Sequence, residues 1–274
     1  MLPRVFLNAV PKTGAHLVER ALELMGYRRG QRSIGSAAVI GRKQLVNALL
    51  RRPVVTADMV IVGIEMPAPV RSSWVRRRLG GTSLGEYLRG HVRYSEYFEH
   101  LLREREFHVI HMVRDPRDVV VSHAHYIMNR PRHPFHRHYR GLGEFANRLT
   151  FSITGGKIPG VGYLDSITER FRAMEKWSDY PRMLTLRFED LVGPGGGGSA
   201  EAQARSLSRL CELLDIEETP DLRKTFEESL FGRSSTFRKG QIGGWRESFD
   251  QTRLELFRTV AGDLLDRWGY SSDS

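Results

Sequence analysis

The sequence has 274 residues, of which 40% are hydrophobic and 27% are charged, so it predicts a folded chain and excludes a disordered one. Its 42 Lys and Arg residues outnumber its 32 Asp and Glu residues, which gives a formal net charge of +10. This charge is typical of proteins that meet an anion such as nucleic acid, an anionic membrane or a phosphorylated small molecule, and a solvated basic surface gives the same balance. The single cysteine, Cys211, excludes an intramolecular disulfide.

The first residues enter a strand pattern directly, without the charged and apolar segments of a secretion signal. No run approaches the about 18 apolar residues of a membrane-spanning helix. We therefore expect a cytoplasmic protein without a membrane partner. The length suits one large core, so residues 1–274 are predicted to form a single domain.

Strand and helix patterns alternate along the chain. Apolar strands are predicted at 5–10, 107–113 and 183–188, and helices at 15–25, from Pro116 onward, at 199–214 and at 251–268. Each strand is followed by a helix, which predicts an α/β fold with a mainly parallel central sheet flanked by helices on both faces.

Three other segments have less regular patterns. Residues 34–90 mix Gly, Pro and Arg with an apolar run at 59–64 and receive no firm assignment. Residues 129–141 are rich in His, Arg and Pro, which predicts a loop or lid. The histidines of this segment have no nearby carboxylate, so we expect no metal site there. The glycines at 195–198 predict a flexible surface connection, since no Lys-Ser or Lys-Thr pair follows them.

The segment 11–16 (PKTGAH) lies between a predicted strand and a predicted helix. A helix N-terminus offers free backbone N–H groups and the positive end of the helix dipole, so anions bind there. Gly14 allows close backbone approach, Lys12 adds a charge and Thr13 adds a hydroxyl. Because Lys precedes Gly, the loop is not a Walker A motif. An ordinary strand-to-helix turn that holds a lysine would give the same pattern.

A second group of polar residues follows the strand at 107–113. Arg114 stands at the carboxyl end of this strand, where open α/β sheets bind ligands. Ser122 comes eight residues later, about two helical turns at 3.6 residues each, on a similar side of the helix. An arginine and a serine hydroxyl can share one phosphate, whereas a capping Asp115 with a solvated arginine is the simpler alternative.

The third group, residues 237–245 (FRKGQIGGW), places two cations beside a glycine-rich turn. Such a turn can cradle an anion. Basic turns are common, so this segment alone is a weak indication.

Together these segments resemble the sulfotransferases that use 3′-phosphoadenosine 5′-phosphosulfate (PAPS), of the cytosolic type and its bacterial relatives. Segment 11–14 is similar to their P-loop-like phosphosulfate-binding loop, 114–122 to their 3′-phosphate signature, and 238–245 to their C-terminal Arg-Lys-Gly motif. Residues 186–191 (LRFEDL) are similar to the aromatic-Glu-Asp segment after a core strand. The motifs occur in the family's order over essentially the whole chain.

The resemblance implies roles for these residues. Lys12 would stabilise the leaving group, and the amides after it would hold the 5′-phosphate. The residues that the resemblance assigns to donor binding are Lys12, Thr13, Gly14, Ala15, His16, Arg114, Ser122, Phe188, Phe226, Arg238, Lys239 and Gly240. Ala15 and Leu17 replace residues common in the animal enzymes, and Phe188 stands where those often have Tyr. Phe226 is assigned to the adenine site.

The family's general base is a histidine upstream of the 3′-phosphate arginine. His91 lies 23 residues before Arg114, close to the family's separation. A histidine suits proton removal at neutral pH because its ordinary pKa is near 6.5. His111, His123 and His125 are the alternatives, and His111, within a strand, is better explained as structural.

The resemblance therefore predicts sulfuryl transfer from PAPS to a hydroxyl or amine of a small-molecule or glycan acceptor, with no metal and no nucleic-acid partner. The alternatives are a nucleotide-dependent phosphoryl transferase and a basic nucleic-acid-binding protein. No motif identifies the acceptor. Residues 246–255 partly resemble the family's dimer motif, which leaves a homodimer open.

Overall fold

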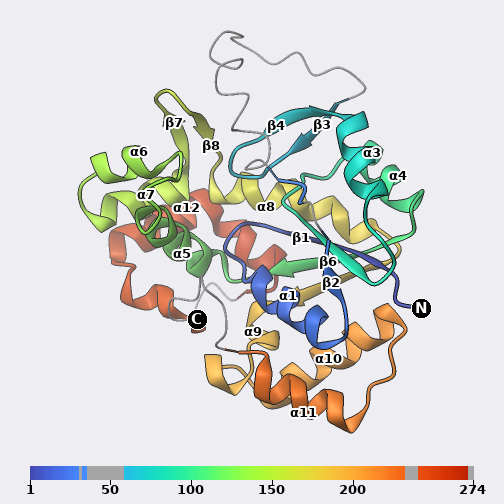
Figure 1. Cartoon of the computed structure of the whole chain (residues 1–274). Coiled ribbons are helices and arrows are strands. Elements are labelled where there is room, and N and C mark those ends of the chain that lie inside the picture. Colours follow the sequence, from blue (N-terminus) through green and yellow to red (C-terminus); the bar gives the residue numbers. More distant parts are fainter. Residues whose placement is uncertain (31–32, 36–58, 232–239, 271–274) are drawn as a thin grey trace.

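The computed structural model describes residues 1–30, 33–35, 59–231 and 240–270 of the chain. Its centre is a five-stranded parallel sheet in the order β2-β5-β1-β6-β9 (Figure 1). The strands of this sheet are β1 (Arg4–Ala9), β2 (Arg28–Arg29), β5 (Glu86–Gly90), β6 (Phe107–Val113) and β9 (Met183–Arg187). Two short antiparallel pairs lie outside it: β3 (Met59–Val62) with β4 (Ala68–Arg71), and β7 (Gly156–Ile158) with β8 (Gly162–Leu164).

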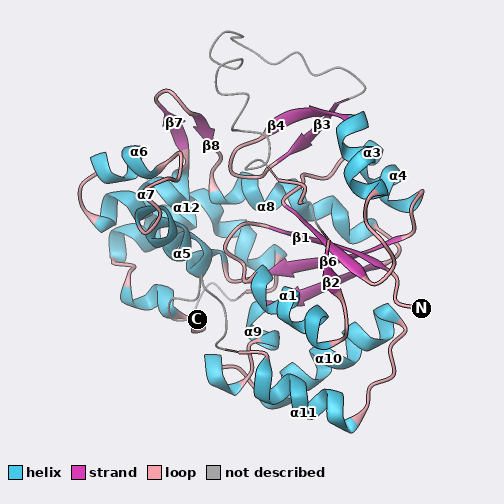
Figure 2. Ribbon diagram, in the orientation of Figure 1, coloured by secondary structure: helices cyan, strands magenta, loops and turns pink. Residues whose placement is uncertain are grey.

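Helices cover both faces of the sheet (Figure 2), which confirms the predicted fold class. One face is covered by α1 (Ala15–Leu24), α10 (Ala200–Leu214) and α11 (Pro220–Ser229), with the short α9 (Phe188–Leu191) beside them. The other face is covered by α3 (Ser72–Gly80), α4 (Glu96–Arg103), α5 (Pro116–Met128), α7 (Phe145–Thr154), α8 (Ile167–Glu175) and α12 (Gln251–Arg267). The helix α6 (His136–Gly141) packs beside α5.

Alternation along β1 explains the two layers. Phe6 packs into the core cluster of α4 and α8, whereas Val5 and Leu7 pack into the cluster of α1 and α10. Successive side chains of a strand point to opposite faces, so a continuous apolar run indicates a strand buried on both faces. All three side chains are fully buried. The central strand therefore fixes both layers and brings its carboxyl end, with the loop that follows, to one edge of the sheet.

The predicted strand at 107–113 coincides with β6, and the helix that follows begins at Pro116 with Asp115 as its cap, whose Oδ1 accepts from the Arg117 amide (2.8 Å). Two expectations need correction. Residues 129–141 are not a loop throughout, because 136–141 form α6. The glycine run lies at the surface, with Gly195 and Gly197 exposed, but it is packed and not a free connection: Gly196 is buried, and a Cβ there would lie 2.9 Å from the carbonyl oxygen of Gly240.

Among the described residues, no helix combines the length and apolar character that crossing a membrane requires.

Candidate active site

The loop between β1 and α1 has an unusual backbone. Lys12 has φ +74° and Gly14 has φ +94°, both in the left-handed region. A lysine in this conformation costs about 1–2 kcal/mol, and such strain is typical of ligand-binding loops. Gly14 is required twice, because a Cβ there would also lie 2.5 Å from Phe188 Cδ2. No side chain caps α1 at Gly14; the amide of Leu17 donates to the carbonyl of Gly14 (2.9 Å), which leaves the amides of Ala15 and His16 to bind an anion.

Thr13 and His16 make contacts within the protein. Thr13 is fully buried, and its hydroxyl donates to the carbonyl of Val10 (2.8 Å), which braces the loop. His16 Nδ1 lies 2.8 Å from a carboxylate oxygen of Glu19, one turn along α1. The expected phosphate contacts of both residues stay predictions.

Lys12 projects toward α5. Its Nζ lies 4.0 Å from the centroid of the Tyr126 ring, a cation–π contact. Burial lowers the pKa of Lys12 to about 8; the negative charge of Glu65 opposes this, while Arg114 and Arg130 add to it. Lys12 is therefore a cation at neutral pH, with its proton held less firmly than that of an exposed lysine.

His91 follows β5, the neighbour of β1 in the sheet. Its Nδ1 lies 2.6 Å from the carbonyl oxygen of Ala9, the last residue of β1. A carbonyl oxygen only accepts hydrogen bonds, so Nδ1 carries the proton and Nε2 of the neutral ring keeps its lone pair. Burial lowers the pKa of His91 to about 4, and the bond to Ala9 opposes this shift. The ring is thus neutral at pH 7, with Nε2 able to take a proton.

Asn8 fixes the segment that carries His91. The side-chain amide of this buried residue donates to the carbonyl of Val92 (3.0 Å), and its oxygen accepts from the Val92 amide (2.9 Å). Trp177 Nε1 donates to the same carbonyl (3.1 Å). Because Val92 is the next residue after His91, these bonds hold the imidazole beside the end of β1.

Replacing Asn8 with alanine is expected to lower the free energy of unfolding by about 1–3 kcal/mol, because it leaves the buried amide of Val92 without an acceptor. Equilibrium unfolding in urea measures this. The matched control is Asn147→Ala, since the exposed side chain of Asn147 also donates to a carbonyl, that of Leu142 (3.0 Å). Equal, small losses in the two variants would contradict the role of Asn8.

Arg114 lies at the carboxyl end of β6, as predicted, and its guanidinium is 4.2 Å from the centroid of the Phe188 ring. One terminal nitrogen donates to the carbonyl of Gln241 (2.9 Å) and lies 3.4 Å from Asp118 Oδ2. Within the described residues, its buried Nε has no hydrogen-bond partner. Buried donors are rarely left unpaired, so this atom fits a bound anion.

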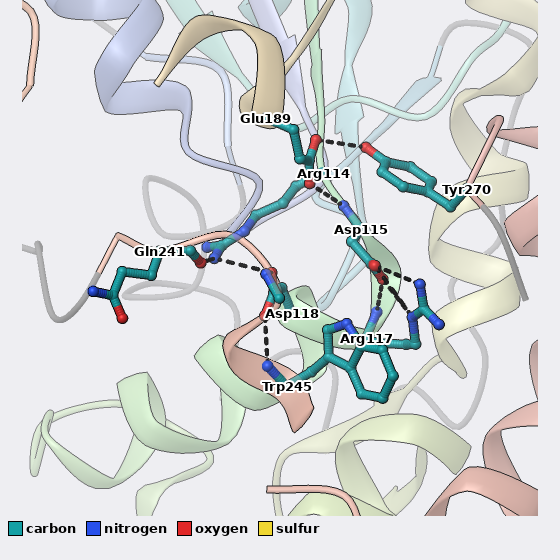
Figure 3. Close-up of polar contacts among 9 residues, drawn as sticks. Arg114, Asp115, Arg117, Asp118, Glu189, Gln241, Trp245 and Tyr270 are labelled. Atoms are coloured by element: carbon teal, nitrogen blue, oxygen red, sulfur yellow. Dashed lines mark hydrogen bonds and ion pairs between the residues drawn. The ribbon is translucent and has the colours of Figure 1, made fainter. Parts of the chain in front are cut away.

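Asp118 connects α5 to the C-terminal segment (Figure 3). Its two carboxylate oxygens accept from the amides of Gly243 (3.0 Å) and Trp245 (2.9 Å). Burial raises the pKa of Asp118, while Arg114 and these amide bonds oppose the shift. The carboxylate thus brings the turn after Gly240 beside Arg114, two motifs that are far apart in the sequence.

Glu189 braces the other side of Arg114 (Figure 3). It accepts from the amide of Asp115 (2.9 Å) and from the hydroxyl of Tyr270 (3.0 Å). Asp115 in turn pairs with Arg117 (2.8 Å), whose guanidinium lies 4.1 Å from the centroid of the Trp245 ring. These contacts give the aromatic-Glu-Asp segment a structural reason.

The remaining predicted residues fall in three kinds of place. Phe188 is buried beneath Gly14 and Arg114, and Phe226 is 1% exposed in the core beside α1 and α10. Ser122 is half-buried on α5, and Gly240 has φ +57° next to the glycine run. Arg238 and Lys239 lie outside the described residues. The donor contacts of all six stay predictions.

The alternative histidines are placed differently. His111 is 1% exposed and packs edge-on against Trp268, so it is structural. His123 is fully buried, with Nδ1 3.0 Å from the hydroxyl oxygen of Ser152. His125 stacks on Phe145. In the described part of the chain, no group of three or more His, Cys, Asp or Glu residues is arranged to hold a metal ion.

The sequence reasoning missed four residues of this site: Asn8, Glu65, Asp118 and Tyr126. Asp118 lies within the quoted 114–122 motif, directly after Arg117 and four residues after Arg114, so its acidic charge at that spacing was a usable signal. The sequence signal for Glu65 is weaker: it is a lone carboxylate directly after an apolar run.

The fold and this site define a class of protein: an α/β protein with anion-binding groups at the carboxyl edge of a parallel sheet. The family model for the sulfotransferase domain matches residues 2–269, so the chain belongs to the sulfotransferase family. No curated protein sequence matches the chain.

Solved structures show the same fold. Mouse sulfotransferase SULT7A1, complexed with 3′-phosphoadenosine 5′-phosphate (PAP), superposes with a TM-score of 0.62 at 17% identity, over 98% of this chain and 89% of that one. Retinol dehydratase, in complex with androsterone and the inactive cofactor PAP, gives 0.57 at 15% identity, over 96% of this chain and 80% of that one.

Proposed function

We propose that this protein transfers a sulfuryl group from PAPS to a hydroxyl or amine of a small-molecule or glycan acceptor. The observation that carries the proposal is the contact of His91 with Ala9. Ala9 lies three residues before Lys12, so this contact places a neutral imidazole next to the strained loop. Membership of the sulfotransferase family supports it, as does the presence of PAP in the two solved structures.

The residues present fit a nucleotide with phosphates at two ends. The free amides at the start of α1, with Lys12 beside them, suit the 5′-phosphosulfate. The unpaired Nε of Arg114, with Ser122 further along α5 and Gly240 close to Gln241, suits the 3′-phosphate. PAPS would supply the sulfuryl group and a bisphosphorylated leaving group.

In the proposed reaction, His91 Nε2 accepts the proton of the acceptor hydroxyl as the hydroxyl oxygen bonds to sulfur. The bond between sulfur and the oxygen that joins it to the 5′-phosphate breaks, and both of its electrons stay on that oxygen. Lys12, as a cation, stabilises the negative charge that grows there. Positioning and electrostatic stabilisation therefore supply most of the rate increase.

The two shifted pKa values suit this division of roles. His91 is a base only when neutral, above a pKa of about 4, and Lys12 is a cation only below a pKa of about 8. Both are in the required form at neutral pH, which agrees with the cytoplasmic location that we propose.

Calorimetry with PAP tests the donor site, and a transfer screen with labelled PAPS over phenols, alcohols, amines and glycans tests the reaction. We expect PAP to bind at least tenfold more tightly than adenosine 5′-phosphate, because the 3′-phosphate adds about 1.5–3 kcal/mol through a charge-assisted hydrogen bond. Binding of ATP with magnesium but not PAP would favour a phosphoryl transferase. Steeply salt-dependent DNA binding without PAP binding would favour a nucleic-acid-binding protein.

A further inference from the structure

Glu65 is a buried carboxylate in the turn between β3 and β4. The residue is 9% exposed, and its Oε1 lies 3.3 Å from His123 Nε2 and 3.9 Å from an Arg170 terminal nitrogen. Within the described residues, none of these three buried atoms has a hydrogen-bond partner of good geometry. A charge in such a place is costly unless other charges face it, so its surroundings indicate its role.

The helix α5 places Glu65 and Lys12 side by side. His123 and Tyr126 are three residues apart on α5 and share one face of the helix. Glu65 contacts His123, and the Nζ of Lys12 lies over the ring of Tyr126. The two charged side chains therefore occupy neighbouring positions over the same helix face.

The turn that carries Glu65 is also tied to the base. The amide of Gly63 donates to the carbonyl of His91 (2.7 Å), and Arg93 donates to the carbonyl of Ile64 (3.2 Å). Arg93 also pairs with Asp165, so its charge is balanced. The turn that carries Glu65 is thus bonded to the segment of the imidazole, while Glu65 itself contacts the helix face that Lys12 also contacts.

The charges around Lys12 are mostly positive. Arg114 and Arg130 lower its pKa, as burial does, and among the described groups that act on this pKa only Glu65 is an anion. The other titratable groups nearby are His123 and His133, and burial lowers the pKa of both, so they are neutral.

Around Glu65 the balance is different. Arg170 is fully buried, and its positive charge and that of Lys12 oppose the rise in the pKa of Glu65 that burial causes. Tyr139 also interacts electrostatically with the carboxylate of Glu65. Burial raises the pKa of the Tyr139 hydroxyl, which is therefore neutral. Glu65 therefore faces two cations, Lys12 and Arg170, and the carboxylates of Asp165 and Glu169 also act on Arg170.

We propose that Glu65 is the counter-ion and positioning residue of Lys12, and that Arg170 and His123 hold its carboxylate in place. The inference rests on the proposed function for its purpose, because Lys12 must be a cation to stabilise the leaving group. It does not depend on that function for its test, because the state of Lys12 can be measured in the protein alone.

The test is a pH titration of Lys12 by NMR in protein labelled with ¹³C at lysine Cε. The chain has six lysines, so the spectrum is simple, and Lys12→Met identifies the signal. We expect Glu65→Gln to lower the pKa of Lys12 from about 8 by about one pH unit, since a nearby opposite charge shifts a pKa by about 1–3 units. Glu65→Asp keeps the charge and should restore most of the wild-type value.

Glu19→Gln is the matched control, because Glu19 is also a buried acid close to the loop but does not act on Lys12. In the Glu19→Gln variant, the pKa of Lys12 should equal that in the wild type. If Glu65→Gln fails to fold because Arg170 loses its partner, the double variant Glu65→Gln/Arg170→Met removes both charges and should also lower the pKa of Lys12.

An unchanged Lys12 titration in a folded Glu65→Gln or double variant would overturn the proposal. In activity assays, Glu65→Gln should reduce kcat/KM for PAPS about tenfold at pH 9 and little at pH 6, because the fraction of protonated Lys12 falls by those amounts when its pKa drops by about one unit. A Lys12 shift in a protein that never uses PAPS would uphold the counter-ion and reject the proposed function, so the two failures are distinguishable.

Discussion

Replacing His91 with alanine is expected to lower kcat about 100- to 10,000-fold, the usual contribution of a general base, while the affinity for PAP stays nearly unchanged. The reason is the hydrogen bond from Nδ1 to Ala9, which leaves Nε2 as the atom that can take a proton. Steady-state kinetics with a labelled donor measure kcat, and calorimetry measures PAP binding.

Two further variants separate catalysis from structure. In His91→Asn, the side-chain amide can still donate to the carbonyl of Ala9, but no atom replaces Nε2 as a base. We expect it to be as inactive as His91→Ala. His100→Ala, which changes a 63% exposed histidine on α4, should keep wild-type activity. Full activity in His91→Asn would show that the ring only supports the loop.

The pH dependence adds an independent check. Burial lowers the pKa of His91 to about 4, so the free enzyme loses its base only as the pH falls through about 4. The acid limb of kcat/KM should therefore lie near pH 4. The alkaline limb should lie near pH 8, where Lys12 loses its proton. An acid limb near 6.5, the value of an unperturbed histidine, would contradict the buried environment of His91.

The sheet and its helices could be predicted from the sequence because their signals are local. The apolar run of β6 and the proline at the start of α5 appear within a few residues of each other. The order of the motifs also gave the loop of Lys12 and the position of Arg114. Each of these features depends on neighbouring residues in the sequence and on the alternation of strands and helices along the chain.

The supports of the site could not be predicted because they join distant segments. Asn8 and Val92 are 84 residues apart, and Asp118 and Trp245 are 127 apart. Glu65 gains its role only when α5 and α8 enclose it. The packing of the glycine run could not be predicted either, because the close contact of Gly196 with Gly240 joins two segments that are distant in the sequence.

Replacing Arg114 with alanine is expected to weaken PAP binding roughly tenfold to 150-fold, which corresponds to about 1.5–3 kcal/mol for a hydrogen bond to a charged group. The side chain is held by Phe188, Gln241 and Asp118, so it is oriented before a ligand arrives. Arg114→Lys keeps the charge but loses the planar fork, so its affinity for PAP should fall between those of the wild type and Arg114→Ala. Calorimetry with PAP measures each value.

Arg187→Ala is the control for lost packing, because Arg187 has nearly the same local contacts as Arg114 on the next strand. Its guanidinium lies 4.2 Å from the centroid of the Tyr270 ring and donates to the carbonyl of Gly269 (2.9 Å). Arg187→Ala should lose similar packing and keep its PAP affinity. If both variants weaken PAP binding equally, the loss reflects the stability of the sheet edge, and the 3′-phosphate does not bind at Arg114. If only Arg114→Ala weakens it, the unpaired Nε contacts the anion, and adenosine 5′-phosphate should then bind to Arg114→Ala and to wild type alike.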